Sequence, residues 1–397
     1  MGLNARTLLL ICFTSAAWAF SFGVGSQIVS RWLNVQGISD TVIGLNHSFY
    51  YFGVAVGSCF VPRMTRRLGP AWCAALGMIF AGCTLAVYPW GGAVVGGCVL
   101  RFANGWASAM ALVPLETLVS RDSPPQRKTQ DFACYGVSLT LGGALGIELA
   151  PHLYQLGNTL AFQLGGCVPG VAGLVLMHGL RQRPREPQSR EVATPLGWGR
   201  NFLSYGTAWG QGFLEGGMLA FLALFLIARG FSDAEAGTLM SVTMIGVIVF
   251  QVPVSWLADR YGKMPLLLAC YGVVIAGLLA IPWLSNSIVL AAGLFCFGAC
   301  SGAMYPLGLS LLSDRMPAGG LARAYAWYLA VECVGSQAGA AAMGKARDLW
   351  GDASMFAVGV AALAAVIATW LALCYFLRAA HRSVIVAPCA PNRSEAA

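Results

Sequence analysis

The amino-acid sequence predicts an all-α integral membrane protein whose twelve transmembrane helices form two pseudo-symmetric six-helix bundles. Three observations predict this fold class. Only 10% of the residues are charged and 57% are hydrophobic, whereas a soluble domain is about a quarter charged. Apolar stretches of the roughly 20 residues that span a bilayer recur along the chain. A charged turn follows the second apolar stretch of each half, which indicates one six-helix unit used twice.

The apolar stretches fall into two sets of six. In the first half the predicted helices run near Thr7–Val29, Thr41–Val61, Ala71–Trp90, Gly96–Val119, Phe132–Leu153 and Thr159–Leu180. In the second half they run near Phe202–Ile227, Ala236–Leu257, Met264–Leu284, Ile288–Leu312, Ala322–Met343 and Ala353–Leu377. The first stretch, with Arg6 before it and Ala17-Trp18-Ala19 inside it, is also typical of a secretory signal. Because it continues to about Ile28, long enough to span, we expect an uncleaved first helix.

The connections between these stretches alternate in charge. Nineteen of the 24 Lys and Arg residues lie on one side of the predicted membrane, in the N-terminal segment, the even-numbered connections, which include the central linker, and the tail. The exceptions are Arg31, Arg229, Lys345 and Arg347 on the other side and Arg101 inside a helix. Since basic loops stay in the cytoplasm, we predict a multi-pass protein of the cell inner membrane with both termini cytoplasmic. Both termini on one side require an even number of helices, in agreement with twelve.

The same pattern divides the chain into four segments. We predict an N-terminal six-helix bundle over residues 1–180 and a C-terminal six-helix bundle over residues 201–380. Residues 181–200, which are basic and contain three prolines, are predicted to form a cytoplasmic linker, and residues 381–397 a disordered tail. Neither segment fits an enzyme or nucleotide-binding domain, and the chain has no G-x-x-x-x-G-K-[ST] phosphate loop. We therefore expect no direct use of ATP and no cofactor.

Other protein classes fit the composition less well. The net charge of +8 could indicate nucleic-acid binding, but the charges are dispersed among apolar stretches and form no basic, aromatic-rich face. The 13 cysteines could indicate a disulfide framework. Most of them lie within apolar stretches, where cysteine behaves as a small hydrophobe. There is no C-x-x-C pair and no Cys/His cluster with zinc spacing, so we expect no metal site.

The charged turn of the second half, Asp259-Arg260-Tyr261-Gly262-Lys263, has a degraded copy in the first half at Arg66-Arg67-Leu68-Gly69. With twelve predicted helices in two halves and a basic linker, the chain resembles the major facilitator superfamily over roughly residues 5–380. That family carries Asp-Arg-x-Gly-Arg/Lys between its second and third helices, often repeated between the eighth and ninth. Here Arg66 stands where the family usually has the acid. The resemblance implies a gating loop formed by Asp259, Arg260, Gly262, Lys263, Arg66, Arg67 and Gly69.

The resemblance also implies a mechanism. In the family, two halves rock about a site at mid-membrane, and helices one, four, seven and ten line the cavity. The run Arg101-Phe102-Ala103-Asn104-Gly105 resembles the family's Arg-containing fourth helix. The run Gly142-Gly143-Ala144-Leu145-Gly146 only weakly resembles the Gly-Pro motif of the antiporters, because it lacks the proline.

Two acidic residues are the proton-coupling candidates. Glu215, about thirteen residues into the seventh helix, and Glu332, about ten residues into the eleventh, fall near mid-membrane at a rise of about 1.5 Å per residue. Gln211 lies one turn before Glu215 on the same face. An ionisable group inside a membrane is costly and is a functional candidate by default. The alternative is that each is a hydrogen-bonded acid that determines helix packing.

Arg101 and Glu148 both fall in the outer third of their helices. We predict an ion pair between them that serves structure rather than chemistry. Arg101 also shares a helix face with Asn104 and Ser108, so an anionic substrate contact is the alternative.

Further cavity candidates rest on weaker observations. Glu116 follows Pro114 and either borders the inner cavity or reaches interfacial water. Gln27 lies near the outer end of the first helix, where an interfacial anchor is the favoured interpretation. Tyr305 precedes a proline that can kink the tenth helix. Trp209 either lines the cavity or packs as an ordinary aromatic residue.

Met240 and Met244, and likewise Cys296 and Cys300, are four residues apart and place two sulfurs on one helix face. Soft sulfur ligands select Cu(I), so a copper importer is a lesser alternative. Such spacings also arise by chance in a chain this apolar.

The predicted function is therefore a secondary active transporter that moves a small organic solute by alternating access, coupled to protons, with efflux favoured over uptake. Its expected partners are the lipid bilayer, the solute and protons, and we expect a monomer. The alternative is a non-transporting membrane sensor or partner-binding protein on the same scaffold. A membrane enzyme fits less well, because no nucleophile–base pair is visible.

Overall fold

In the computed structural model, residues 5–92, 94–123, 128–179, 197–316 and 321–385 are described, and long α-helices make up nearly all of them. The first six helices are α1 (Ala5–Val35), α2 (Asp40–Leu68), α3 (Pro70–Ala86), α4 (Val95–Asp122), α5 (Lys128–Leu156) and α6 (Asn158–Gly179). The other six are α7 (Phe202–Ala228), α8 (Asp233–Tyr261), α9 (Lys263–Ala280), α10 (Ser287–Ser313), α11 (Leu321–Trp350) and α12 (Ser354–Ile385). Short 3₁₀ turns follow α3 at Tyr88–Trp90 and α9 at Ile281–Trp283. The predicted number and order of the helices are confirmed.

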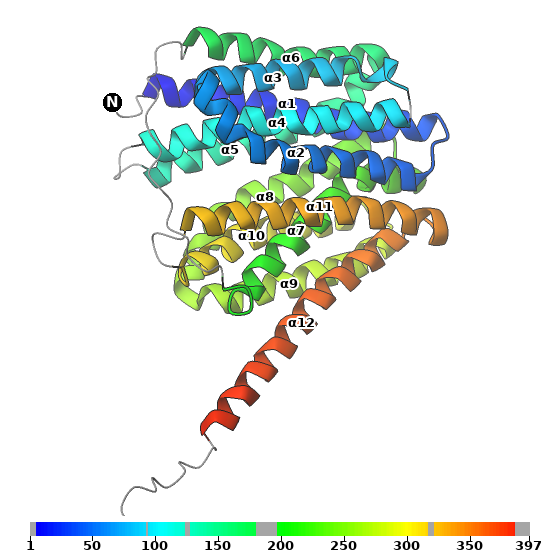
Figure 1. The fold of residues 1–397 in the computed structure, drawn as a ribbon. Coiled ribbons are helices and arrows are strands. Elements are labelled where there is room, and N and C mark those ends of the chain that lie inside the picture. Colours follow the sequence, from blue (N-terminus) through cyan, green and yellow to red (C-terminus); the bar gives the residue numbers. More distant parts are fainter. Residues whose placement is uncertain (1–4, 93, 124–127, 180–196, 317–320, 386–397) are drawn as a thin grey trace, which may run out of the picture.

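The two halves of the chain lie side by side as separate groups of helices. Figure 1 shows α1 to α6 above and α7 to α12 below, with α12 leaving the second group at an angle. The helix α12 continues through Ile385, past the predicted end of the second bundle at residue 380. Residues 180–196, which make up most of the predicted linker, and residues 386–397 of the predicted tail lie outside the described residues.

Eight of the helices in the described part of the chain are long and apolar enough to cross a membrane by length and composition. The helices α2, α5 and α11 do not reach that standard, and α3 is a shorter apolar helix. The three less apolar helices share one property: each packs against a helix of the other half, α2 against α11 and α5 against α8. Part of the surface of these three helices therefore meets protein of the other half and not lipid.

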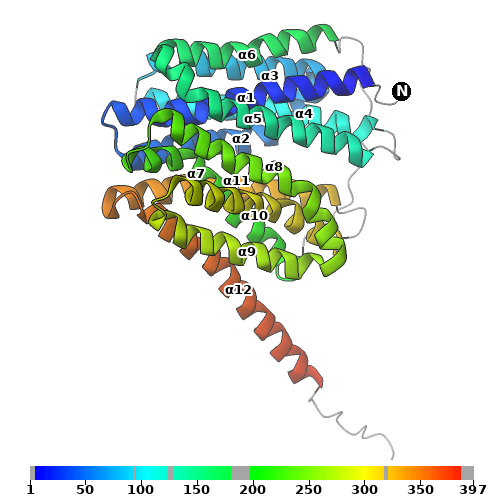
Figure 2. The same ribbon diagram turned by 180° about the vertical axis from the view of Figure 1, so that it is seen from behind.

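The contact between α2 and α11 is close because of glycine. Figure 1 shows these two helices adjacent, and Figure 2 shows α5 beside α8 from behind. A Cβ at Gly44 of α2 would overlap the backbone oxygen of Ala340, and a Cβ at Gly344 of α11 would overlap that of Asp40. Two small residues thus allow the backbones of the two halves to approach, which is how helices pack closely in lipid.

The two copies of the charged turn have the same backbone conformation. Gly69 ends α2 and begins α3 with φ of 89°, and Gly262 ends α8 and begins α9 with φ of 89°. Each glycine amide donates to the carbonyl four residues earlier, at Thr65 and at Ala258. A positive φ of this kind strongly favours glycine. The repeat is therefore structural as well as sequential, even though Arg66 replaces the acid of the first copy.

Candidate functional site

A cavity of about 440 Å³ lies between the two halves. Four helices of the first half (α1, α2, α4 and α5) and the four corresponding helices of the second half (α7, α8, α10 and α11) supply its lining residues. The remaining helices, α3, α6, α9 and α12, contribute none of the described lining residues. The cavity is thus shared by the two halves, as a site between two moving bundles requires.

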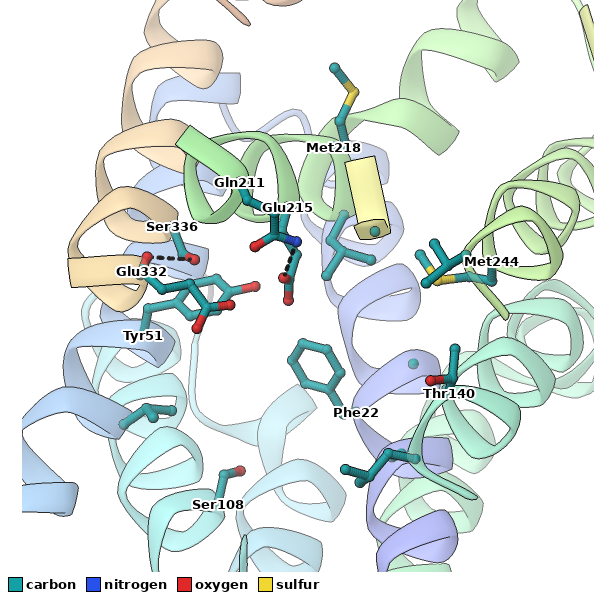
Figure 3. A pocket seen from close by; sticks show the side chains of 18 of the residues that line it. Phe22, Tyr51, Ser108, Thr140, Gln211, Glu215, Met218, Met244, Glu332 and Ser336 are labelled. Carbon is teal, nitrogen blue, oxygen red and sulfur yellow. Dashed lines mark hydrogen bonds between the residues drawn. The ribbon is translucent and has the colours of Figure 1, made fainter. Parts of the chain in front are cut away.

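Three carboxylates line this cavity. Glu215 of α7 and Glu332 of α11 come from the second half, and Glu116 of α4 comes from the first. Figure 3 shows Glu215 and Glu332 directed into the same space, with Tyr51 of α2 beside Glu332. Gln211 Nε2 donates to Glu215 Oε2 at 3.2 Å. Ser336 donates to the backbone oxygen of Glu332, and no described side chain donates to the Glu332 carboxylate.

Glycines in α7 and α11 bring the two carboxylates to one place. A Cβ at Gly212 of α7 would overlap the backbone oxygen of Glu332, and a Cβ at Gly216 would overlap that of Ser336. In the other direction, a Cβ at Gly335 would overlap the backbone oxygen of Trp209. Because the backbones touch at this crossing, Glu215 projects into the cavity from α7 next to the point where Glu332 projects from α11.

Aromatic rings form the wall opposite the two carboxylates. Trp18 and Phe22 of α1 are stacked, with ring centroids 5.5 Å apart and an angle of 7° between the ring planes. Phe22 also contacts Tyr50 of α2, with centroids 5.3 Å apart. Trp18 Nε1 donates to Ser108 Oγ of α4 at 3.2 Å, which holds the indole in place. These side chains all line the cavity, so its wall is apolar and rich in π systems.

The predicted ion pair between Arg101 and Glu148 does not form. Arg101, only 2% exposed, approaches His47 Nδ1 at 3.3 Å through Nη2, and its guanidinium carbon lies 4.9 Å from the centroid of the Tyr50 ring. Glu148 Oε1 instead accepts from Thr238 of α8 at 3.1 Å. The reason is helix packing: α4 lies against α2 and α3, whereas α5 lies against α1 and α8. The helices α4 and α5, although consecutive in the sequence, barely contact each other.

Among the other predicted cavity residues, Gln211 and Glu116 line the cavity and the rest do not. Asn104 donates to the Ala81 carbonyl and to Thr84, so it ties α4 to α3. Trp209 packs on Phe213, and the Tyr305 carbonyl accepts from the Tyr328 hydroxyl. Gln27 lines a separate small pocket and donates to the Leu219 carbonyl across the interface. Arg101 lies behind Tyr50 rather than on the cavity surface.

The two sulfur pairs differ in position. Met240 and Met244 both line the cavity, together with Met218 of α7. Neither Cys296 nor Cys300 is among the described lining residues. Cys296 is exposed on the outside of the helix bundle, where lipid would be. The four sulfurs therefore do not form one site, and the methionines act as part of the apolar wall.

The predicted gating loop has one described ion pair. Lys263 Nζ lies 2.6 Å from Oδ2 of Asp314 at the end of α10. The Arg260 guanidinium carbon lies 5.7 Å from the centroid of the Tyr261 ring. The side chain of Asp259 lies outside the described residues. Arg66 and Arg67 form the last turn of α2 before Gly69. A gating role for this loop stays a prediction.

Among the described residues, the ion pairs between the two halves lie at one end. This end, where α1 ends and α2 begins, is called the distal end, because it lies away from the chain termini. Arg31 Nε of α1 lies 3.0 Å from Asp233 Oδ1 of α8. Arg347 Nε of α11 lies 2.8 Å from Asp40 Oδ2 of α2. The backbone amides of Asp40 and Thr41 donate to the Asp348 carboxylate at 2.9 and 2.7 Å. Charged side chains therefore join the two halves at the distal end.

The sequence interpretation did not assign several lining residues to the site. Phe22, Tyr50 and Tyr51 were not among the predicted site residues, yet they form much of the wall around the carboxylates. Around these residues α1 and α2 carry apolar side chains on several faces, so the face turned to the cavity has no distinct pattern. The one signal in the sequence that could have identified these residues was their depth in the membrane, which is close to that of Glu215 and Glu332.

Comparison with known proteins identifies relatives of this chain. A family model described as Major Facilitator Superfamily matches residues 7–340 and 210–388. The uncharacterized MFS-type transporter YfkF of Bacillus subtilis is 26% identical over 312 residues, which cover 75% of this chain and 78% of the relative. An uncharacterized MFS-type transporter of Yersinia pestis is 27% identical over 333 residues, which cover 80% of this chain and 83% of the relative.

Solved structures of transporters share the fold. A D-xylose-proton symporter superposes with a TM-score of 0.77 at 15% identity, covering 92% of this chain and 97% of the symporter. The nucleoside transporter NupG superposes with a TM-score of 0.74 at 14% identity, covering 94% of this chain and 99% of that protein. At such low identity the similarity concerns the arrangement of the helices.

Proposed function

The chain belongs to the Major Facilitator Superfamily of secondary transporters and is not an enzyme, and we propose that it exchanges a small organic solute for protons by alternating access. One observation carries this proposal: Glu215 and Glu332 face one cavity between the halves, and no described lining residue is basic. An acidic residue at the centre of a membrane helix costs about 2.5–3.5 kcal/mol on insertion scales. The free-energy cost of two such residues in one cavity is lower when protons neutralise them during part of the transport cycle.

Alternating access requires that the cavity close at one end while it communicates with the other. The distal ion pairs Arg31–Asp233 and Arg347–Asp40 join the halves at one end. With both termini in the cytoplasm, as the distribution of basic residues favours, the distal end faces away from the cytoplasm. In this conformation the carboxylates would exchange protons and solute with the cytoplasmic side. Rocking of the halves would break the distal contacts and expose the same carboxylates to the other side.

The proposal is tested with purified protein in vesicles. Solutes that raise the unfolding temperature are found in a panel of organic anions, cations and neutral compounds, because a bound ligand stabilises the folded state. Each hit is then offered to vesicles with an imposed pH gradient. We expect gradient-driven movement in the wild type and its loss in E215Q and E332Q. Exchange of labelled for unlabelled solute, which needs no net proton movement, should persist in both variants at a solute concentration that saturates the site.

A matched control uses a carboxylate away from the cavity. Glu235 accepts from the amide and the hydroxyl of Ser232 at the start of α8. Glutamine is also a favoured residue at this position of the capping box, so E235Q should preserve the helix start. This variant should transport like the wild type. Unchanged gradient-driven transport in both E215Q and E332Q would remove these residues from the coupling mechanism.

A further inference from the structure

We propose that the solute is an organic cation with a largely apolar, aromatic body, an inference that rests on the proposed exchange function and names its substrate class. The inference comes from the chemistry of the cavity wall. Three features of the wall point to the same ligand: its charge, its aromatic rings and its size.

The charge of the wall has one sign. Its 34 lining residues include Glu116, Glu215 and Glu332 and, within the described part of the chain, no lysine, arginine or histidine. The Glu332 carboxylate receives no hydrogen bond from a described side chain, and Glu215 receives one, from Gln211. An anionic solute would enter a site where nothing balances its charge. A cation would provide the partner that these carboxylates lack.

The nearest buried cation does not change this conclusion. Arg101 lies 4.9 Å from the centroid of the Tyr50 ring and contacts His47, which does not line the cavity either. It is nearly fully buried and is not a lining residue. A solute in the cavity therefore meets the face of Tyr50 rather than the guanidinium group.

The aromatic rings suit a cation that is also apolar. Trp18, Phe22 and Tyr50 form a connected row of rings along one side of the cavity, in which Trp18 and Phe22 are stacked. Tyr51 and Phe297 also line it. Ring faces attract cations, most strongly where water is excluded. The remaining wall consists of aliphatic side chains and of Met218, Met240 and Met244, whose flexible thioethers adapt to aromatic ligands.

The size of the cavity limits the ligand. A cavity of about 440 Å³ lies within the range of 300–1,000 Å³ that is typical of sites for drug-sized molecules. A bare metal ion or ammonium would leave most of the apolar wall without a contact. An aromatic cation with several rings would fill it.

The same carboxylates would then bind either the cation or protons. When the cation enters, its positive charge replaces a proton on Glu215 or Glu332, and the proton leaves to water. When protons return from the other side of the membrane, they displace the cation. One positive charge is exchanged for another at the same acidic oxygens, so the net charge of the apolar cavity is conserved.

The test uses two ions of the same shape and opposite charge, tetraphenylphosphonium and tetraphenylborate. Binding of each is measured by equilibrium dialysis to the protein in lipid nanodiscs, and binding to empty nanodiscs is subtracted. We expect tetraphenylphosphonium to bind above background and tetraphenylborate not to. Lowering the pH should weaken the binding of the cation, because protons compete for the carboxylates. E215Q and E332Q should each weaken it by about tenfold or more, and E235Q should leave it unchanged.

Several outcomes would overturn the proposal. These are binding of tetraphenylborate at least as tight as that of tetraphenylphosphonium, cation binding that is unchanged in both E215Q and E332Q, or no binding of tetraphenylphosphonium, ethidium and rhodamine. Elution of the variants as single symmetric peaks in size-exclusion chromatography shows that they are folded. If a neutral or anionic solute follows the pH gradient while the cations do not bind, the substrate class fails and the transport function stands. If the cations bind but no gradient moves them, the transport function fails and the site stands.

Discussion

Arg347 of α11 places its Nε 2.8 Å from Oδ2 of Asp40 in α2, so a residue of the second half holds the start of a helix of the first. The side chain of Arg347 is only 3% exposed and that of Asp40 15%. Arg347 also pairs with Asp352 and lies over the Phe221 ring. The neighbouring Asp348 accepts the first two backbone amides of α2. The start of α2 is thus capped by the other half, and opening of the distal end would uncap it.

We predict that R347A loosens the distal end. Removal of one partner from a buried ion pair costs about 3–5 kcal/mol, because the other charge stays buried without a partner. Backbone amides near Asp40 should therefore exchange with deuterium faster in R347A, since the free energy of local opening falls. Mass spectrometry of peptides from the start of α2 measures this exchange.

The control is K263A at the other end of the protein. Lys263 pairs with Asp314, and their side chains are 27% and 53% exposed. An exposed pair of this kind contributes about 0–1 kcal/mol, so K263A should leave exchange at the start of α2 unchanged. Equal exchange in the wild type and R347A would show that the ion pair does not hold the distal end.

We predict that low pH weakens the contribution of Asp348 to the stability of the closed distal end. Asp348 lies beyond the apolar stretch of α11. Burial alone would raise the pKa of Asp348, but hydrogen bonds from Thr41 and Asp40 and the charge of Arg347 together hold it below its ordinary value. A carboxylate with a lowered pKa stabilises the closed state above its pKa in the open state, about 3.9. That stabilisation is lost as the pH falls through the lower pKa of the closed state.

The measurement is the difference in amide exchange at the start of α2 between the wild type and D348N, corrected for intrinsic exchange rates. Asp40, whose pKa is raised by burial in spite of Arg347, is present in both proteins. We expect faster exchange in D348N near neutral pH and a difference that shrinks below about pH 4. A difference that stays constant into the acid range would contradict the role of the Asp348 charge.

We predict opposite effects for two glycine-to-alanine changes. In G216A the new Cβ would overlap the backbone oxygen of Ser336, so α7 must move away from α11. Overpacking of this kind typically costs about 1–3 kcal/mol, and unfolding temperature should fall. In G272A of α9 the Cβ meets nothing within 4 Å, and a helix gains up to about 1 kcal/mol from this replacement.

Proton-coupled transport should also be lower in G216A than in G272A. Because the α7–α11 crossing positions Glu215 against Glu332, G216A should weaken proton-coupled transport and G272A should preserve it. Thermal unfolding and vesicle transport measure the two effects. If the G216A protein is as stable and as active as the G272A protein, close contact between α7 and α11 is not needed for stability or transport.

We predict that Arg101 and Glu148 act independently. Their described partners are different, His47 and Tyr50 for Arg101 and Thr238 for Glu148. Effects of residues without shared partners add within about 0.3–0.5 kcal/mol. The losses of stability in R101A and E148A should therefore sum to that of the double variant in a detergent-unfolding titration. A coupling energy well above this value would show that Arg101 and Glu148 interact, as the sequence predicted.

The same titration provides a positive control. Arg347 and Asp40 are in direct contact, so the cycle of R347A, D40A and the double variant should give a coupling energy of about 0.5–3 kcal/mol.

The carboxylates of the candidate site could be predicted from individual residues, whereas its aromatic wall could not. Glu215 and Glu332 stood out as acids within long apolar stretches, and the structure places both on the cavity between the halves. Glu116, which follows Pro114, and Gln211, one turn before Glu215, were also cavity candidates, and both line the cavity. Their proton-coupling roles remain predictions, because a cavity position is compatible with them but does not test them.

The sequence by itself determined the number and order of the helices and the repeated turn at Gly69 and Gly262. These depend on local physics: a bilayer needs about 20 apolar residues per crossing, and a backbone with φ of 89° favours glycine. No knowledge of distant contacts is needed to see either one.

Only the tertiary structure decided which helix faces meet each other. Arg101 lies against Tyr50 and not Glu148, because α4 packs on α2 while α5 packs on α1 and α8. Phe22 and Tyr51 line the cavity, whereas Trp209 packs elsewhere. In a membrane helix the faces toward lipid, neighbour and cavity are all apolar, so residue type cannot distinguish them. Close backbone contacts between segments far apart in the chain, such as Gly216 on Ser336, determine which face each side chain shares.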